Sequence, residues 1–271
     1  MKIKLTMLLL ILSILIFKSC TVNTKNESPL EIIAFCDMTT SLDTISIKKL
    51  ARDVRNMITK VPYGTVINIY PINDNTFTDK IFTIPYRNID KRSKKQKREE
   101  METRKSEGEK IEKIIIDNYT KMNKDSSSEY KSCIISSLET VYDIVKTNGN
   151  KDNIHVVFFS DMIEQCEISI ADKMYMCSNK LNPKKEDLIQ QVKEKYIPNF
   201  NIKKLIGNRV TVIVSTNLKK HVRCLQESER KAVWKEVFKK VGYSAEDFES
   251  FHFNQNSRDD WSTLGQNPNV K

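Results

Sequence analysis

The chain has 271 residues, of which 39% are hydrophobic and 30% charged, and its formal net charge is +10. Six glycines and seven prolines are too few for a collagen-like or low-complexity chain, and the hydrophobic content supports a folded core. No C-x-x-C pair occurs among the six cysteines, so the sequence gives no support for a structural zinc site.

Residues 1–20 are predicted to be an export signal and not part of the fold. Lys2 and Lys4 precede an apolar run, Met7–Phe17, which is shorter than the about 20 residues that span a membrane. Ser19 and Cys20 follow, an order that resembles the lipobox of bacterial lipoproteins, in which the cysteine carries the lipid. We therefore expect a membrane-anchored protein of the cell envelope, with its lipid on Cys20. An ordinary signal peptide with an incidental cysteine is the alternative.

After a polar tether at residues 21–30, residues 31–255 alternate between patterns typical of strands and of helices. The predicted strands are Ile32–Cys36, Thr65–Tyr70, Lys80–Ile84, Ile154–Phe159, Arg209–Val214 and Phe248–Phe253. The predicted helices are Ile45–Val61, Asp90–Asn123, Ser132–Lys146, Lys185–Tyr196 and Glu227–Val241. This alternation predicts a single doubly wound α/β domain with a mostly parallel sheet of about six strands. A polar tail, residues 256–271, is expected to follow.

Residues 90–123 are predicted to form a long charged helical insert. Lys91–Arg98 is nearly all basic, and Glu99–Lys113 mixes both signs with few apolar residues. Apolar residues return only near the end, so we expect a helix that is solvated in its first half and docked in its second. Binding of nucleic acid is the alternative for the basic run, but the export signal argues against it and aromatic residues do not interleave.

Side chains that carry oxygen follow the predicted strands. Asp37, Thr39 and Ser41 alternate directly after the first strand, and Ser160 and Asp161 end the most hydrophobic one. The carboxyl ends of the strands are where open α/β sheets bind ligands. Hydroxyl and carboxylate groups suit a hard cation such as Mg²⁺. The alternative for residues 37–41 is an Asx or Ser/Thr turn that leads into a helix N-cap.

Three short segments, in this order, resemble the motifs of the von Willebrand factor A family. D-M-T-T-S at residues 37–41 resembles the family's D-x-S-x-S turn. Ser132–Leu138 resembles its T-N-I-G-x-A-L segment and places Ser132 at the Thr position. Val156–Asp161 resembles the hydrophobic strand that ends in T-D-G, with Met162 in place of the Gly.

The resemblance implies a metal-ion-dependent adhesion site that binds Mg²⁺, or Mn²⁺ or Ca²⁺, and whose shell an acidic side chain of a partner protein completes. It implies protein binding without turnover. The ligands that it implies are Asp37, Thr39, Ser41, Ser132 and Asp161.

Two other functions stay open. A phosphatase of the haloacid dehalogenase type would use Asp37 as its nucleophile, but it needs an acid where Thr39 stands. A metal-free scaffold of the envelope is the other alternative.

The remaining chemistry-bearing residues are expected to be structural. Export permits disulfides, and Cys166 and Cys177 share a polar loop in which they are predicted to pair. Cys36 is expected to be a buried strand residue, because a free cysteine behaves as a small hydrophobe. His155 lies inside a hydrophobic strand and is expected to be packed, not catalytic.

Overall fold

The computed structural model describes residues 29–39, 42–72, 80–89, 93–124, 132–148, 154–162, 167–169, 172–173, 190, 210–215, 227–241 and 261–262. The strands of its main sheet are β1 (Glu31–Asp37), β2 (Val66–Ile72), β3 (Phe82–Ile84), β4 (Ile154–Phe159) and β7 (Val210–Ser215). The helices are α2 (Thr44–Lys60), α3 (Lys94–Lys124), α4 (Ile134–Asn148) and α7 (Glu227–Lys240). No helix in the described residues is long and apolar enough to cross a membrane.

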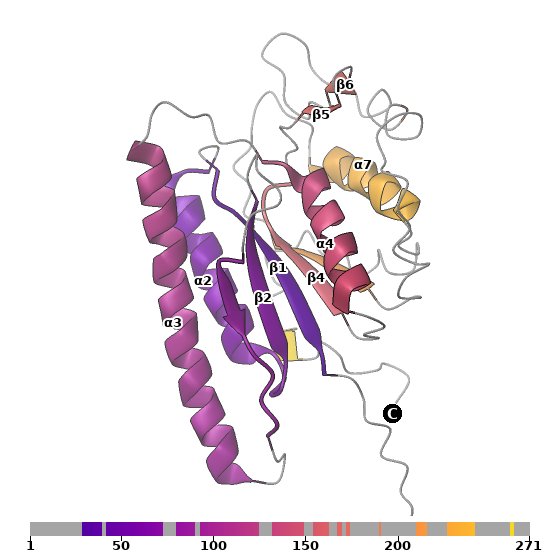
Figure 1. The fold of residues 1–271 in the computed structure, drawn as a ribbon. Helices are drawn as coiled ribbons and strands as arrows, with labels where there is room; N and C mark the ends of the chain where they lie inside the picture. Colours follow the sequence, from indigo (N-terminus) through magenta and orange to yellow (C-terminus); the bar gives the residue numbers. More distant parts are fainter. Residues whose placement is uncertain are drawn as a thin grey trace, which may run out of the picture.

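The sheet is open, with the strand order β3-β2-β1-β4-β7. β2, β1, β4 and β7 are parallel, and β3 is an antiparallel edge strand. Figure 1 shows α2 and α3 on one face and α4 and α7 on the other. The prediction of a mixed α/β fold with a mostly parallel open sheet flanked by helices is therefore confirmed. The carboxyl ends of β1 and β4, which are neighbours, meet at one edge of the sheet.

The strand count and one loop differ from the prediction. The described sheet has five strands, and the predicted strand Phe248–Phe253 lies outside the described residues. The same holds for the predicted helix Lys185–Tyr196, apart from Gln190, which is helical. Where a long loop was expected after Met162, two short antiparallel strands form a second sheet, β5 (Glu167–Ser169) and β6 (Asp172–Lys173).

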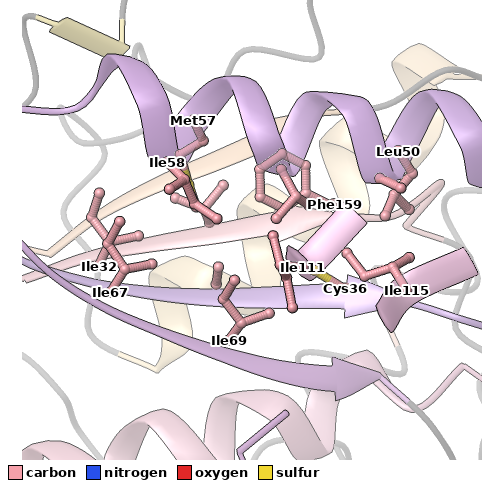
Figure 2. Close-up of a cluster of buried hydrophobic side chains, with 14 of the residues drawn as sticks. Ile32, Cys36, Leu50, Met57, Ile58, Ile67, Ile69, Ile111, Ile115 and Phe159 are labelled. Atoms are coloured by element: carbon pink, nitrogen blue, oxygen red, sulfur yellow. The ribbon is translucent and has the colours of Figure 1, made fainter. Parts of the chain in front are cut away.

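The larger core cluster lies between the sheet and the α2–α3 pair. Apolar residues at alternate positions of β1, β2 and β4 meet those at helical spacing on α2 and α3, as Figure 2 shows. The labelled members are Ile32, Cys36, Leu50, Met57, Ile58, Ile67, Ile69, Ile111, Ile115 and Phe159. Burial raises the pKa of the Cys36 thiol, as does the neighbouring charge of Asp37, so this cysteine is a packing residue as predicted.

Aromatic rings pack on the opposite face of the sheet. Phe35 of β1 stacks on Phe158 of β4 at a centroid distance of 5.3 Å, and Phe158 contacts Phe238 of α7 at 6.2 Å. Trp234, also on α7, is fully buried beside Phe238 at 5.7 Å. These ring contacts fix α7 against β4, which places Trp234 near the carboxyl end of the sheet.

Most residues in the first half of α3 are exposed, but two of its charged residues are buried, which the prediction of a solvated first half did not foresee. Glu100 and Arg104 are 4% and 1% exposed, and their side chains form an ion pair at 2.6 Å. The Arg104 guanidinium also donates to the carbonyls of Ile58 and Val61, at the end of α2, at 3.3 Å each. These are carbonyls that a helix end leaves without helical partners. The charged residues therefore dock α3 against α2 along its first half as well as its second.

The packed part of the chain also extends into the predicted polar tail. Trp261 is 3% exposed, belongs to the larger core cluster and contacts the Phe159 ring at a centroid distance of 6.0 Å. No periodic pattern of apolar residues surrounds Trp261 in the sequence, so its packing could not be predicted.

His155 makes stability depend on pH. It is buried in β4, and in the described part of the chain its Nδ1 atom has no hydrogen-bond partner. Burial lowers the pKa of the imidazole from 6.5 to about 4. Because the folded state disfavours the imidazolium, this contribution to stability is complete above pH 6.5 and is lost as the pH falls toward 4.

We expect His155→Leu to remove that part of the pH dependence, about 3 kcal/mol between pH 7.5 and pH 4 for a shift of this size. Urea unfolding of both proteins at a series of pH values measures it. The same acid-induced loss in wild type and variant would contradict the assignment.

Candidate functional site

Asp37 is the last residue of β1 and lies fully buried at the carboxyl edge of the sheet. Its Oδ1 atom accepts hydrogen bonds from the backbone N–H of Thr39 at 3.1 Å and from the Thr39 hydroxyl at 2.6 Å. A carboxylate that bonds the amide two residues on forms an Asx turn, the alternative considered for this stretch. The Asx turn and the proposed ligand set therefore do not exclude each other. The turn places the Thr39 hydroxyl against the Asp37 carboxylate.

Ser132 comes from a distant part of the chain and meets the same group. It lies two residues before α4 and is fully buried. Its Oγ atom is 2.9 Å from Thr39 Oγ1 and 3.2 and 3.1 Å from the two carboxylate oxygens of Asp37. Three of the five predicted site residues thus share one hydrogen-bonded cluster.

Ser160 is a member of the cluster that the predicted set omitted. Parallel pairing places Cys36 beside Phe159, so the next residues, Asp37 and Ser160, stand level with each other. Ser160 Oγ donates to Asp37 Oδ2 at 2.8 Å and accepts from the backbone N–H of Met162 at 2.9 Å. Its position at the end of a buried strand, directly before Asp161, was the available signal.

Met162 keeps the backbone conformation that the family's glycine would favour. Its φ is +57°, in the left-handed region, at a cost of about 1–2 kcal/mol for a residue with a Cβ. Its N–H bonds to Ser160, and its carbonyl accepts from the Trp234 indole N–H at 2.9 Å. Trp234 therefore holds the turn after Asp161 from α7, a role that no sequence motif indicated.

Asp161 follows this strand on the same edge and is 4% exposed. Its charge acts on Asp37, whose pKa is raised from 3.8 to about 6 by burial first and by Asp161 second. The hydrogen bonds from Thr39 and Ser160 oppose this rise. Two buried carboxylates of like charge repel each other. This repulsion favours protonation of one carboxyl group or the binding of a cation.

Several predicted residues lie outside the described part of the chain, namely Ser41, Cys20, Cys166 and Cys177. The pairing predicted for Cys166 and Cys177 stays a prediction. Cys133, next to Ser132, is disulfide-bonded, whereas Cys36 is free. The sequence analysis did not predict a disulfide for Cys133.

The donor atoms fit a small hard cation. Neighbouring ligands in an octahedral Mg²⁺ shell, each about 2.1 Å from the ion, lie about 3.0 Å apart. The oxygen–oxygen distances within Asp37, Thr39 and Ser132 run from 2.6 to 3.2 Å. No group of three or more His, Cys, Asp or Glu side chains that could hold a metal ion occurs in the described residues, so a cation here would depend on hydroxyl oxygens beside the carboxylates of Asp37 and Asp161.

Comparison with known proteins gives structural neighbours only. No protein-family model matches the chain, and no curated protein matches it. A von Willebrand factor type A protein from Catenulispora acidiphila aligns with 78% of this chain at 9% identity and a TM-score of 0.39. The pilus adhesin SpaC from Lactobacillus rhamnosus GG, in an open conformation, aligns with 78% at 8% identity and a TM-score of 0.34. The alignments span 37% and 27% of those two proteins.

Proposed function

We propose that this protein is a binding module of the cell envelope that holds a divalent cation at the carboxyl edge of its sheet and engages an acidic side chain of a partner protein. The observation that carries the proposal is the convergence of Asp37, Thr39 and Ser132 at the spacing of a cation shell. Asp161 and Ser41 complete the proposed ligand set. The activity proposed is binding, without turnover.

The chain's own residues prepare the site in three ways. The strand end and the Asx turn of Asp37 fix two oxygens, and the start of α4 supplies the third, from Ser132. Ser160 orients the second oxygen of Asp37. Burial excludes water, which strengthens electrostatic attraction within the site. When bound, Mg²⁺ or a similar cation would be balanced in charge by the two carboxylates of Asp37 and Asp161, and a partner's carboxylate would replace water as one of its ligands.

Membrane anchoring through Cys20 is part of this proposal. It rests on the lipobox-like order of residues 1–20, with the tether at residues 21–30 leading to the domain. The positive net charge alone would give only weak adhesion that salt disrupts.

A metal-free scaffold is the second candidate, and one observation favours it. The Asp37 carboxylate accepts hydrogen bonds from the Thr39 amide and from the hydroxyls of Thr39, Ser132 and Ser160, so the cluster is satisfied without a cation. In that case the site would stabilise the sheet edge and recruit no partner.

A capture experiment separates the two candidates. The purified protein is immobilised and exposed to envelope extract in Mg²⁺ and in chelator, beside an Asp37→Asn variant. We expect a partner that wild type retains only in Mg²⁺ and that the variant does not retain in either condition. Retention of the same proteins in chelator, or by the variant, would contradict a cation-dependent module.

A further inference from the structure

A basic and aromatic surface lies at the end of the domain opposite the candidate site. We name it the basic end and define it by residues of the α2–β2 turn, of the segment after β3 and of the start of α3. Its cations are Lys60, Arg87, Lys94, Lys95, Lys97 and Arg98, and its aromatic residues are Tyr63 and Tyr86. Of the eight, only Lys97 is half-buried, and the others are exposed.

Direct contacts hold these segments together. Arg104 of α3 bonds the last carbonyls of α2 and lies 6.0 Å from the centroid of the Tyr63 ring. A Cβ on Gly64 would lie 3.5 Å from the Tyr86 ring. The guanidinium of Arg87 reaches Glu100 at 3.5 Å. These contacts hold the α2–β2 turn and the segment after β3 against α3, so the three segments of the basic end belong to the same end of the domain.

The charges of the basic end are only partly neutralised within the chain. Lys95 and Arg98 pair with acids one turn on, at 3.9 and 3.0 Å, in exposed pairs of little energetic value. Lys94 and Lys97 form no ion pair in the described part of the chain. The first turn of α3 holds no acidic residue, so these cations face the positive end of the helix dipole, which disfavours the helix. An external anion would remove that penalty.

The exposed tyrosines indicate which kind of anion. Tyr63 and Tyr86 are 39% and 51% exposed, two of only four large apolar side chains exposed in the described residues. Tyrosine beside Lys and Arg is the pattern of surfaces at the boundary between lipid headgroups and water. A soluble polyanion would explain the cations but gives no reason to expose the two tyrosines beside them.

The basic end also lies at the end of the domain where β1 begins, next to the tether. Figure 1 shows that α3 begins at the end of the domain where β1 begins, and β1 starts two residues after Pro29. The eight residues between Cys20 and Pro29 span at most about 30 Å. A lipid on Cys20 would keep the basic end near the bilayer. The carboxyl edge of the sheet, with Asp37, would then lie at the end of the domain that is farther from the bilayer.

We propose that the basic end rests on the anionic headgroups of the membrane that anchors the protein and so turns the candidate site away from the bilayer. The proposal rests on the membrane anchoring proposed above and names the surface that orients the anchored domain.

The test uses the full-length protein mixed with phosphatidylcholine vesicles, with or without phosphatidylglycerol, and probed by acetylation of lysine amines with mass spectrometry. We expect Lys94, Lys95 and Lys97 to lose reactivity several-fold on vesicles with phosphatidylglycerol only, and to regain it at high salt. Lys113 and Lys121, exposed further along α3, are internal references that should not change.

Two double variants complete the design. Lys94→Glu/Lys97→Glu should abolish the anionic-lipid effect on Lys95, and its affinity for these vesicles should fall by about tenfold or more. Lys113→Glu/Lys121→Glu changes the net charge equally and should behave as wild type. Three results would overturn the proposal. Neutral vesicles could protect the lysines as well as anionic vesicles do, or the two double variants could be protected equally. Soluble polyphosphate could also give the same protection.

Flotation of the same samples reports the anchor separately. An anchored protein floats with neutral vesicles as well, whereas a protein without an anchor floats only with anionic ones. Lysine protection without flotation on neutral vesicles would support the basic end while contradicting the anchor on Cys20.

Discussion

Replacing Asp37 by Asn is expected to stabilise the protein in chelator at pH 8 and to destabilise it, relative to wild type, in excess Mg²⁺. The folded-state pKa of Asp37, about 6, exceeds its ordinary value of 3.8, so its ionisation costs stability as the pH rises through 6. Asn removes this charge, keeps an oxygen that accepts from Thr39, and offers its amide N–H₂ to the Ser132 and Ser160 hydroxyls. A gain of about 1–3 kcal/mol in chelator follows.

In Mg²⁺ the order should reverse. Binding to the folded state adds about 4.1 kcal/mol when the free cation is at about 1,000 times its dissociation constant, which exceeds the gain expected for the Asn variant in chelator, and the Asn variant should gain none of this. Urea unfolding in both conditions measures the difference. Asp43→Asn is the matched control, because Asp43 caps α2 outside the cluster, Asn can also cap a helix, and any change in stability should be the same with and without cation. A metal-free scaffold would show no effect of Mg²⁺ on wild type.

Asp37→Ala would be a poorer probe of the site. It removes the acceptor of the buried hydroxyls of Thr39, Ser132 and Ser160, and each buried donor left without a partner costs about 1–3 kcal/mol. Loss of partner binding by that variant could therefore reflect loss of the fold. The isosteric Asn variant avoids this ambiguity.

Arg104→Met is expected to lower the free energy of unfolding by about 3–5 kcal/mol, the usual cost of breaking a buried ion pair by removing one partner. Glu100 would keep a buried charge with only the more distant and more exposed Arg87 beside it. The carbonyls of Ile58 and Val61 would lose their guanidinium donor. Urea unfolding again measures the effect.

Arg98→Met is the control for Arg104→Met, because its ion pair with Glu102 lies on the same helix and is exposed. It should cost less than about 1 kcal/mol. Adding Glu100→Gln to Arg104→Met should recover part of the loss, because it removes the stranded charge. Equal effects of the two Arg variants would show that Arg104 does not hold α3 to α2.

The sequence was sufficient for the elements that repeat a simple pattern. Ile154–Phe159 was predicted as a strand and is β4, between β1 and β7, where a doubly covered strand is apolar throughout. Asp37 and Thr39 were found because they follow a strand at its carboxyl end, where open α/β sheets bind ligands, and Ser132 was found through its resemblance to a family motif.

What the sequence could not show depends on contacts between distant residues. The charged sequence around Arg104 is typical of a solvated helix. Arg104 is buried because its guanidinium bonds carbonyls at the end of α2, a contact that the sequence does not show. Trp234 and Met162 are 72 residues apart, and the bond between them follows from how α7 packs on the sheet. Ser160 was visible at its strand end, but its role depends on the register that sets it level with Asp37.

The central claim is that a divalent cation binds beside Asp37, and titration with Mn²⁺ followed by electron paramagnetic resonance tests it most directly. The account predicts one Mn²⁺ bound per wild-type chain, displaced by Mg²⁺, and none bound at the same concentrations by Asp37→Asn. Absence of bound Mn²⁺ in wild type, or equal binding by the Asn variant, would contradict it.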